Sequence, residues 1–336
     1  MMGQFIMMGI HGLELDPSVR NLIMETGIGN FILFKRNIKD QVQVKGLCDS
    51  LVKTCLEAGL PQPIIAVDQE GGPIQRLGPP NWPVVPSNSS VAWSDNPTDG
   101  VIRQAKLVAI TLKDAGIGIN LAPVLDLAQP GTKGVLAERS YGPDPEETGR
   151  LGVLYINTIQ ALGICACAKH FPGIGRVTED PHIERPVISA TEDVLFRELL
   201  PFRMAIDAGV AAIMTSHVTF TALDPDEPAT YSTYVADRLL RGEFRFNGTL
   251  ITDDLEMKGA TGHLSIGSAA LKAFLAGHDL LLICHEAEKV KMAVAFLDKA
   301  LSRGIISAER LDESLERLDT LRNKIATVPH VDRQMV

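Results

Sequence analysis

The chain has 336 residues, of which 45% are hydrophobic and 22% are charged, a composition typical of globular enzymes and unlike that of disordered proteins. Its formal net charge of −9, without a long basic segment, argues against nucleic acid or an anionic membrane as the main partner. Apolar runs are too short to span a membrane, and residues 1–12 lack the features of a signal peptide, so we expect a cytoplasmic protein.

The cysteines also indicate a reducing compartment. Five is an odd number, and four of the five lie in strongly apolar segments. Cys165 and Cys167 alternate along a predicted strand and are too close in sequence for an ordinary disulfide. We therefore expect buried, reduced thiols at these five positions: Cys48, Cys55, Cys165, Cys167 and Cys284.

Eight short apolar runs follow one another along the chain, and each ends in polar or glycine residues. They cover residues 4–10, 29–36, 63–70, 118–126, 163–170, 211–218, 248–256 and 278–285. The segments between them have helical periodicity, and several of these end in glycine, namely Gly59, Gly163 and Gly209. Strands that are apolar on both faces and alternate with helices predict a parallel sheet covered by helices.

Eight such units most simply close into an α/β fold of the (β/α)8 TIM-barrel class. A doubly wound open sheet is the alternative, but the first strand is not followed by the Gly-x-Gly-x-x-Gly pattern of its nucleotide-binding form. Because no linker, low-complexity tract or charge block divides the chain, we predict a single domain over residues 1–336. An amphipathic helix at about 307–326 closes it.

Ionisable residues gather at the ends of the predicted strands. In a barrel, the carboxyl ends of the strands face the active site, so these side chains are expected to lie together. Burying them is costly unless each finds a partner or a function. In chain order they are Asp68 with Arg76 nearby, Asp126 with Arg139 nearby, Lys169 and His170, His217, Asp253 and Asp254, and His285.

A structural interpretation competes at each position, because a single Asp or His at a strand end is more often a cap or a salt-bridge partner. Asp254, for example, can simply begin the next helix. The role of His285 stays open. The remaining histidines lack supporting neighbours, and we interpret four of them as structural or exposed: His11, His263, His278 and His330.

Two other chemistries are less favoured by the sequence. A metal site is not expected, because His170, His182 and His217 form neither an H-x-H nor an H-E-x-x-H pair. Lys169 as a Schiff-base lysine would need a dry pocket that lowers the pKa of its amine, whereas ionisable residues gather around its predicted position. The abundance of acids favours hydrogen bonding to hydroxyl groups, and no cofactor is expected.

The segment "KHFPGIGRVTEDPH" at 169–182 resembles the K-H-F-P-G-H-G-x(4)-D-S-H loop of bacterial β-N-acetylhexosaminidases of glycoside hydrolase family 3. "VDQEGGPIQR", "LAPVLD…ERSYG", "MTSHV" and "ITDDLEMKGA" are similar to the family's other blocks, in the same order. The resemblance covers most of the chain. It implies a (β/α)8 barrel, expected to be a monomer, that removes non-reducing terminal N-acetylglucosamine from cell-wall (peptidoglycan) fragments without a metal.

The resemblance also implies roles for individual residues. Asp253 matches the nucleophile of a retaining mechanism, and His182 with Asp180 matches the acid/base pair. A histidine with a pKa near neutrality suits a group that first donates a proton and then accepts one. The sugar-binding positions of the family match Asp68, Arg76, Arg139, Lys169 and His170, and His217 is expected to line the pocket.

Three positions depart from the family pattern. Ile174 replaces a histidine, Pro181 replaces a serine and Pro73 replaces an arginine. Proline at 181 restricts Asp180 and removes an N–H, and Ile174 removes a polar partner, so the loop's closed form is expected to differ. These departures leave a catalytically impaired sugar-binding protein as one alternative to the N-acetylglucosaminidase. A glycoside phosphorylase and a β-glucosidase on the same fold are the others.

Overall fold

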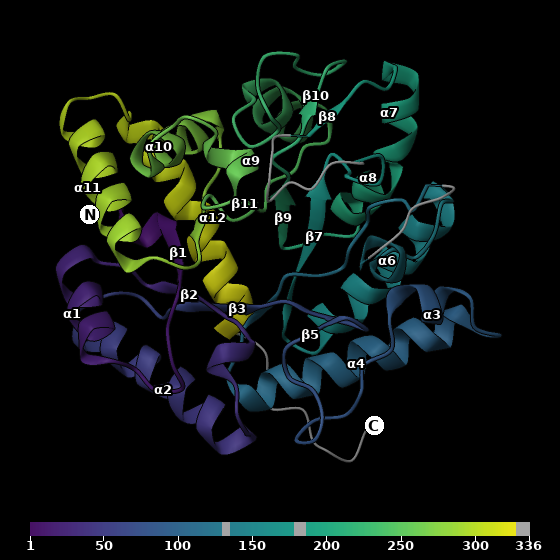
Figure 1. The fold of residues 1–336 in the computed structure, drawn as a ribbon, viewed down its shortest axis with the longest axis horizontal. Coiled ribbons are helices and arrows are strands. Elements are labelled where there is room, and N and C mark those ends of the chain that lie inside the picture. The colour runs from purple at the N-terminus through teal and green to yellow at the C-terminus, as the bar shows by residue number, and fades with distance from the viewer. Residues whose placement is uncertain (130–134, 178–185, 327–336) are drawn as a thin grey trace.

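The structure is a computed structural model that describes residues 1–129, 135–177 and 186–326. Eight parallel strands form one sheet in the order β11-β9-β7-β6-β3-β2-β1-β12. A further parallel bridge between Ile251 and Leu280 joins β11 to β12 and closes the ring. The predicted (β/α)8 barrel is confirmed (Figure 1). The strands are β1 (Ile6–Gly9), β2 (Asn30–Leu33), β3 (Ile64–Val67), β6 (Ile119–Asn120), β7 (Cys165–Phe171), β9 (Ala212–Thr215), β11 (Thr249–Thr252) and β12 (Leu281–Ile283).

Seven of the eight predicted strand segments contain a whole barrel strand, and β7 extends one residue beyond its predicted segment, to Phe171. Every residue of these strands is buried, because side chains on one face fill the barrel and those on the other meet the surrounding helices. This two-sided burial explains why the strands read as continuous apolar runs rather than as alternating patterns. The five cysteines are all buried and free.

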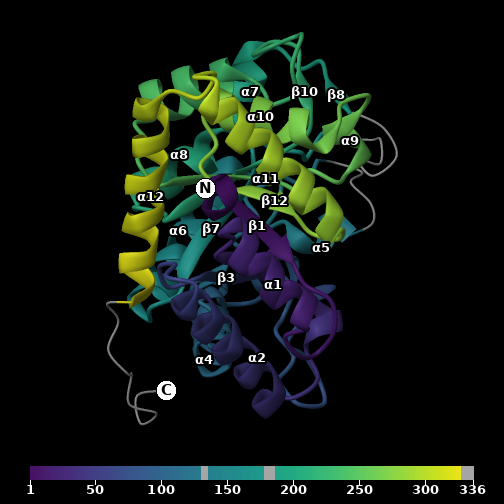
Figure 2. The ribbon, with the colours of Figure 1, turned by 90° about the vertical axis from the view of Figure 1, so that its left-hand side faces the viewer.

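Helices surround the barrel, as the two views show (Figures 1 and 2). Among the described residues, none of these helices combines the length and apolar character needed to span a membrane. The α-helices are α1 (Pro17–Thr26), α2 (Gln41–Glu57), α3 (Asn88–Ala92), α4 (Pro97–Ala115), α5 (Val135–Arg139), α6 (Pro145–Ala161), α7 (Glu192–Glu198), α8 (Leu200–Asp207), α9 (Lys258–Thr261), α10 (Ile266–Ala276), α11 (Ala287–Ser302) and α12 (Ala308–Ala326). A π-helix covers Tyr234–Glu243, and short 3-10 helices cover Met2–Phe5 and Lys35–Asn37.

Glycine and proline set several helix ends. Gly59, Gly163 and Gly209 have φ values of 70°, 93° and 75° just after their helices, the left-handed conformation that glycine adopts without strain. The helical pattern at 191–209 is divided into α7 and α8. Pro201 lies in the first turn of α8, where its missing N–H breaks no helical hydrogen bond.

The closing helix α12 begins within a residue of its predicted start and runs along the outside of the barrel (Figure 2). It is tied to the barrel by Asp279, a fully buried residue that precedes β12. Arg310 and Arg317 of α12 reach the Asp279 carboxylate at 3.6 and 3.1 Å, and Arg241 reaches it at 2.8 Å. This cluster anchors the C-terminal helix at the amino end of the sheet.

Candidate active site

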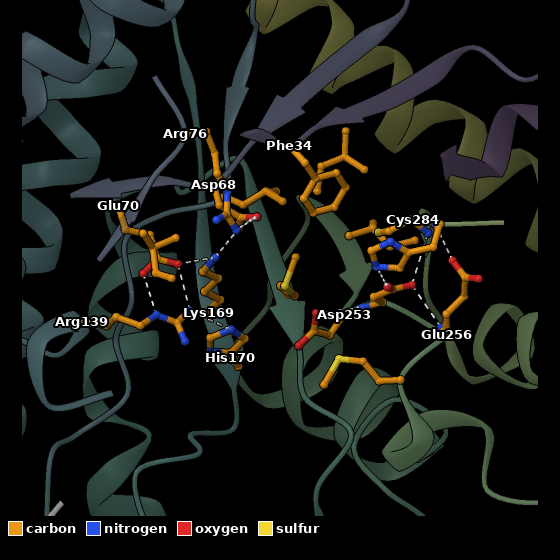
Figure 3. Close-up of a pocket in the computed structure, with 18 of the residues that line it drawn as sticks. Phe34, Asp68, Glu70, Arg76, Arg139, Lys169, His170, Asp253, Glu256 and Cys284 are labelled. Atoms are coloured by element: carbon orange, nitrogen blue, oxygen red, sulfur yellow. Dashed lines mark hydrogen bonds and ion pairs between the residues drawn. The ribbon is translucent and has the colours of Figure 1, made fainter. Parts of the chain in front are cut away.

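A cavity of about 520 Å³ opens at the carboxyl ends of the strands, a volume suited to a small ligand such as a sugar. Figure 3 shows Asp253 between two groups of side chains, with Asp68, Glu70, Arg139, Lys169 and His170 on one side and Cys284 with Glu256 on the other. Six predicted site residues are brought together on its wall: Asp68, Arg76, Arg139, Lys169, His170 and Asp253.

The first side of the cavity is a network of buried ion pairs. Lys169, inside β7, places its Nζ 2.7 Å from Asp68 Oδ1 and 2.7 Å from Glu70 Oε1. Glu70 also accepts two hydrogen bonds from Arg139, at 2.7 and 2.9 Å. Burial alone would lower the pKa of Lys169, but the two carboxylates raise it above its usual value. The lysine is therefore held as a cation.

Asp68 and Arg76 are joined by a tight hairpin of β4 (Gln69–Gly71) and β5 (Ile74–Gln75). At Gly71, φ is 99° and a side chain would meet the carbonyl oxygen of Pro86 at 2.2 Å, so only glycine fits. The hairpin returns Arg76 to within 3.4 Å of Asp68. Burial opposes ionisation of Asp68, but Lys169 and Arg76 lower its pKa to about 2.

His170 is oriented by Asp126, which is fully buried. The Asp126 carboxylate lies 2.7 Å from Nδ1 of His170 and also accepts the backbone N–H groups of His170 and Ile174. The Nε2 of His170 lies 3.5 Å from Arg139. The backbone of Ile174 is thus fixed to Asp126 by a hydrogen bond that does not involve the Ile174 side chain.

Asp253 directly follows β11, and its Oδ1 accepts the backbone N–H of Asp254 at 2.8 Å. Burial raises its pKa, but the nearby His170 and His217 more than offset this and hold the pKa below its usual value. Within the described residues it forms no salt bridge, whereas three other acids that line the cavity each pair with a lysine or an arginine: Asp68, Glu70 and Glu256. The lowered pKa favours the ionised form of Asp253, which has no paired cation in the described part of the chain.

The second side of the cavity contains Asp254 and His285, whose Oδ2 and Nε2 lie 3.2 Å apart. The other oxygen of Asp254 accepts the backbone N–H groups of Glu256 and Cys284, at 3.1 and 3.3 Å. Burial, together with the charges of Glu256 and Asp253, raises the pKa of Asp254 to about 7. Asp254 and Asp253 are adjacent in sequence but have opposite electrostatic environments.

The remaining predicted positions lie elsewhere. His217 is buried behind the cavity wall, with Nε2 2.9 Å from the carbonyl oxygen of Asp254 and Nδ1 2.7 Å from Thr230 Oγ1, so it supports the turn that carries Asp253 and Asp254. Pro73 is exposed. The predicted acid/base residues Asp180 and His182, with Pro181 and His330, lie outside the described residues.

Sequence reasoning missed several residues that line the cavity, among them Glu70 and Phe34. Glu70 forms salt bridges with both Lys169 and Arg139, and its position two residues after Asp68 was the available signal, since i and i+2 share one face of an extended chain. Phe34 follows β2 and lines the cavity, yet nothing in its sequence context marks it. Across the described part of the chain, no three His, Cys, Asp or Glu side chains cluster so that they could hold a metal ion.

The fold and the site together are those of a (β/α)8-barrel enzyme that brings a carboxylate and several cations into one cavity. Residues 2–321 match the Glycosyl hydrolase family 3 N terminal domain. The chain therefore belongs to glycosyl hydrolase family 3 and is a glycoside hydrolase.

Curated relatives and solved structures agree with this assignment. The beta-hexosaminidase of Tolumonas auensis is 36% identical over 87% of this chain and 85% of its own length. A family 3 beta-N-acetylglucosaminidase from Paenibacillus sp. FPU-7 superposes with a TM-score of 0.93 at 37% identity, covering 99% of this chain and 64% of that one. The beta-N-acetylhexosaminidase of Beutenbergia cavernae has a TM-score of 0.87 at 26% identity, covering 95% and 97%.

Proposed function

We propose that the protein is a retaining β-N-acetylglucosaminidase that releases non-reducing terminal N-acetylglucosamine from cell-wall fragments. In this proposal Asp253 is the nucleophile. Its support is that this carboxylate has no cationic partner within the described residues, whereas Asp68, Glu70 and Glu256 each pair with a lysine or an arginine. A nucleophile must keep a lone pair available, and a direct ion pair would compete for it.

The neighbouring acid suits this role less well. Both oxygens of Asp254 have partners, and its pKa of about 7 leaves it partly protonated at neutral pH. Asp253 has a lowered pKa and one oxygen with no hydrogen bond inside the described part of the chain. These differences favour Asp253 within the pair.

The buried ion pairs would bind the sugar hydroxyls. Lys169, Arg139 and Arg76 line the cavity as cations, and the Nε of Arg76 is buried without a hydrogen-bond partner among the described residues. Charge-assisted hydrogen bonds to a ligand contribute roughly 1.5–3 kcal/mol each. The ion pairs fix these donors before the substrate arrives, so little ordering cost remains.

The reaction then proceeds in two displacements. An Asp253 oxygen attacks C1 of the sugar while the bond from C1 to the leaving oxygen breaks, and an acid protonates that oxygen. Water next attacks C1, gives its proton to the same group as base, and releases Asp253 as a carboxylate. The sequence resemblance assigns the acid/base role to His182 assisted by Asp180, and this assignment stays a prediction.

The experiment is hydrolysis of 4-nitrophenyl N-acetyl-β-D-glucosaminide beside the matching β-glucoside. We expect turnover of the first, a β-configured product by NMR, and activity lost by orders of magnitude in Asp253→Ala. A fluorinated sugar that traps the intermediate should add its mass to the peptide containing "ITDDLEM". Labelling of Asp254 instead would contradict the assignment.

The same assay separates the alternatives. Preferred turnover of the glucoside would indicate a β-glucosidase, and a phosphate-dependent sugar phosphate product would indicate a phosphorylase. Binding of N-acetylglucosamine without turnover of either substrate would indicate an impaired sugar-binding protein. If His182 is the acid, His182→Ala should lose more activity on a sugar leaving group than on an activated phenol.

A further inference from the structure

The exposed ring at the mouth of the cavity is unusually well fixed. The side chain of His285 is 54% exposed, yet its Nε2 is held by Asp254 at 3.2 Å and its ring stacks on Phe34 with centroids 5.7 Å apart. Its backbone N–H donates to the Glu256 carboxylate, and its carbonyl oxygen lies 2.8 Å from Nε2 of His11. Exposed side chains seldom have this many constraints, because ordering them costs rotamer entropy.

Phe34, on which the His285 ring stacks, is itself held in place. Phe34 lies under the guanidinium group of Arg36, at 4.4 Å from the ring centroid, and Arg36 donates to the carbonyl oxygen of Cys284 at 2.7 Å. Lys289 of α11 reaches the Glu256 carboxylate at 3.3 Å. Residues from the ends of β2, β11 and β12 therefore hold one histidine in place at the cavity mouth.

The position of His285 relative to Asp253 indicates which part of the substrate it contacts. Asp253 lies between the ion-pair network and the side of the cavity that contains Cys284 and Glu256 (Figure 3). The ring of His285 contacts Asp254, the residue next to Asp253. A sugar bound by the ion-pair network with C1 at Asp253 would thus direct its leaving group toward this second side.

We propose that His285, supported by Phe34 and Asp254, is the aglycone-binding residue of the enzyme and contacts the sugar that departs from Asp253. This inference rests on the proposed function and adds the ligand of the second subsite, a pyranose. His285 is exposed to solvent, whereas a residue that binds a substituent of the enclosed sugar would be buried. We therefore assign His285 to the aglycone rather than to such a substituent. Its Nδ1 has no partner within the described residues and can bond a hydroxyl.

The test compares two substrates that share the glycosyl group. For wild type and His285→Ala, kcat/KM is measured with N,N′-diacetylchitobiose, which has a sugar aglycone, and with the 4-nitrophenyl glycoside. The disaccharide-to-aryl ratio should fall about twofold to twelvefold, which corresponds to the loss of one neutral hydrogen bond of about 0.5–1.5 kcal/mol. Phe34→Leu should lower the ratio less, and His263→Ala, an exposed histidine outside the cavity, should leave it unchanged.

A second measurement does not depend on the leaving group. With the aryl glycoside as donor, added methyl N-acetyl-β-D-glucosaminide competes with water for the glycosyl-enzyme, and His285→Ala should reduce the fraction transferred to the sugar. His285→Gln serves in both assays if the alanine variant does not fold. An unchanged ratio and transfer fraction, or equal losses on both substrates, would overturn the proposal. Failure of the wild type on both substrates would instead refute the proposed function.

Discussion

Replacement of Glu70 by glutamine tests whether the ion-pair network holds the site together. The Glu70 side chain is only 1% exposed and contacts both Lys169 and Arg139. Glutamine keeps its shape but removes the negative charge and turns an N–H2 group toward one of these donors. Three cations, including Arg76, would then face the single carboxylate of Asp68.

The expected cost is large because the remaining charges stay buried. Breaking a buried ion pair by removing one partner destabilises a protein by about 3–5 kcal/mol. With an unfolding entropy of about 2.1 cal/mol/K per residue, a chain of 336 residues loses about 1.4 °C of Tm per kcal/mol. We therefore expect Tm to fall by about 4–7 °C. Displacement of the two donors should lower kcat/KM by roughly one to two orders of magnitude.

Glu147→Gln is the matched control, because Glu147 also accepts two hydrogen bonds from one arginine, Arg150, at 2.8 and 2.7 Å. Both side chains of that pair are nearly half exposed, so its loss should cost less than about 1 kcal/mol. Thermal unfolding followed by circular dichroism and initial rates on the aryl glycoside give the two readouts. If Glu70→Gln had the same Tm as the control variant and an unchanged kcat/KM, the reasoning would be refuted.

Three further substitutions probe other buried acids. Asp126→Asn should lower kcat/KM about tenfold and stability by about 1–3 kcal/mol, because an amide cannot accept all the N–H groups that converge on it from His170 and its loop; rates and urea unfolding measure both. Asp254 has a raised pKa of about 7, so the folded state binds its proton more tightly than the unfolded state, and stability falls as pH rises from about 4 to about 7. Asp254→Asn retains the neutral form and should be more stable than wild type at pH 8, by at most about 4 kcal/mol, but not at pH 4; a difference independent of pH would contradict this. Asp279→Asn should lower stability by about 3–5 kcal/mol through its arginine partners, including Arg317, without changing kcat/KM of the folded enzyme, as melting and rate measurements would show.

The barrel could be predicted because its strands are buried on both faces and alternate with amphipathic helices. That signal is local, so a run such as residues 63–70 indicates a strand without knowledge of its neighbours. The division of the helical segment at 191–209 was not predicted, since its apolar period continues through Pro201.

The site was predicted only at the level of strand ends. The rule that parallel strands end on one face brought Asp68, Lys169 and Asp253 to one cavity. Which side chains pair across it was not predictable, because the contact of Glu70 with Arg139 depends on how strand and loop lie in space. The same holds for the contact between Phe34 and His285. These residues follow β2 and β12, which are far apart in the sequence but lie on either side of β1 in the barrel.

The geometry also bears on the Schiff-base alternative for Lys169. An amine that attacks a carbonyl must be neutral, which requires a pKa lowered by burial or by neighbouring cations. Lys169 is buried, but two carboxylates at 2.7 Å reverse that effect and raise its pKa. An ammonium held between Asp68 and Glu70 can donate hydrogen bonds but has no lone pair with which to form a covalent bond. The charges that make Lys169 a poor nucleophile are thus the ones that suit it to binding hydroxyl groups beside Asp253.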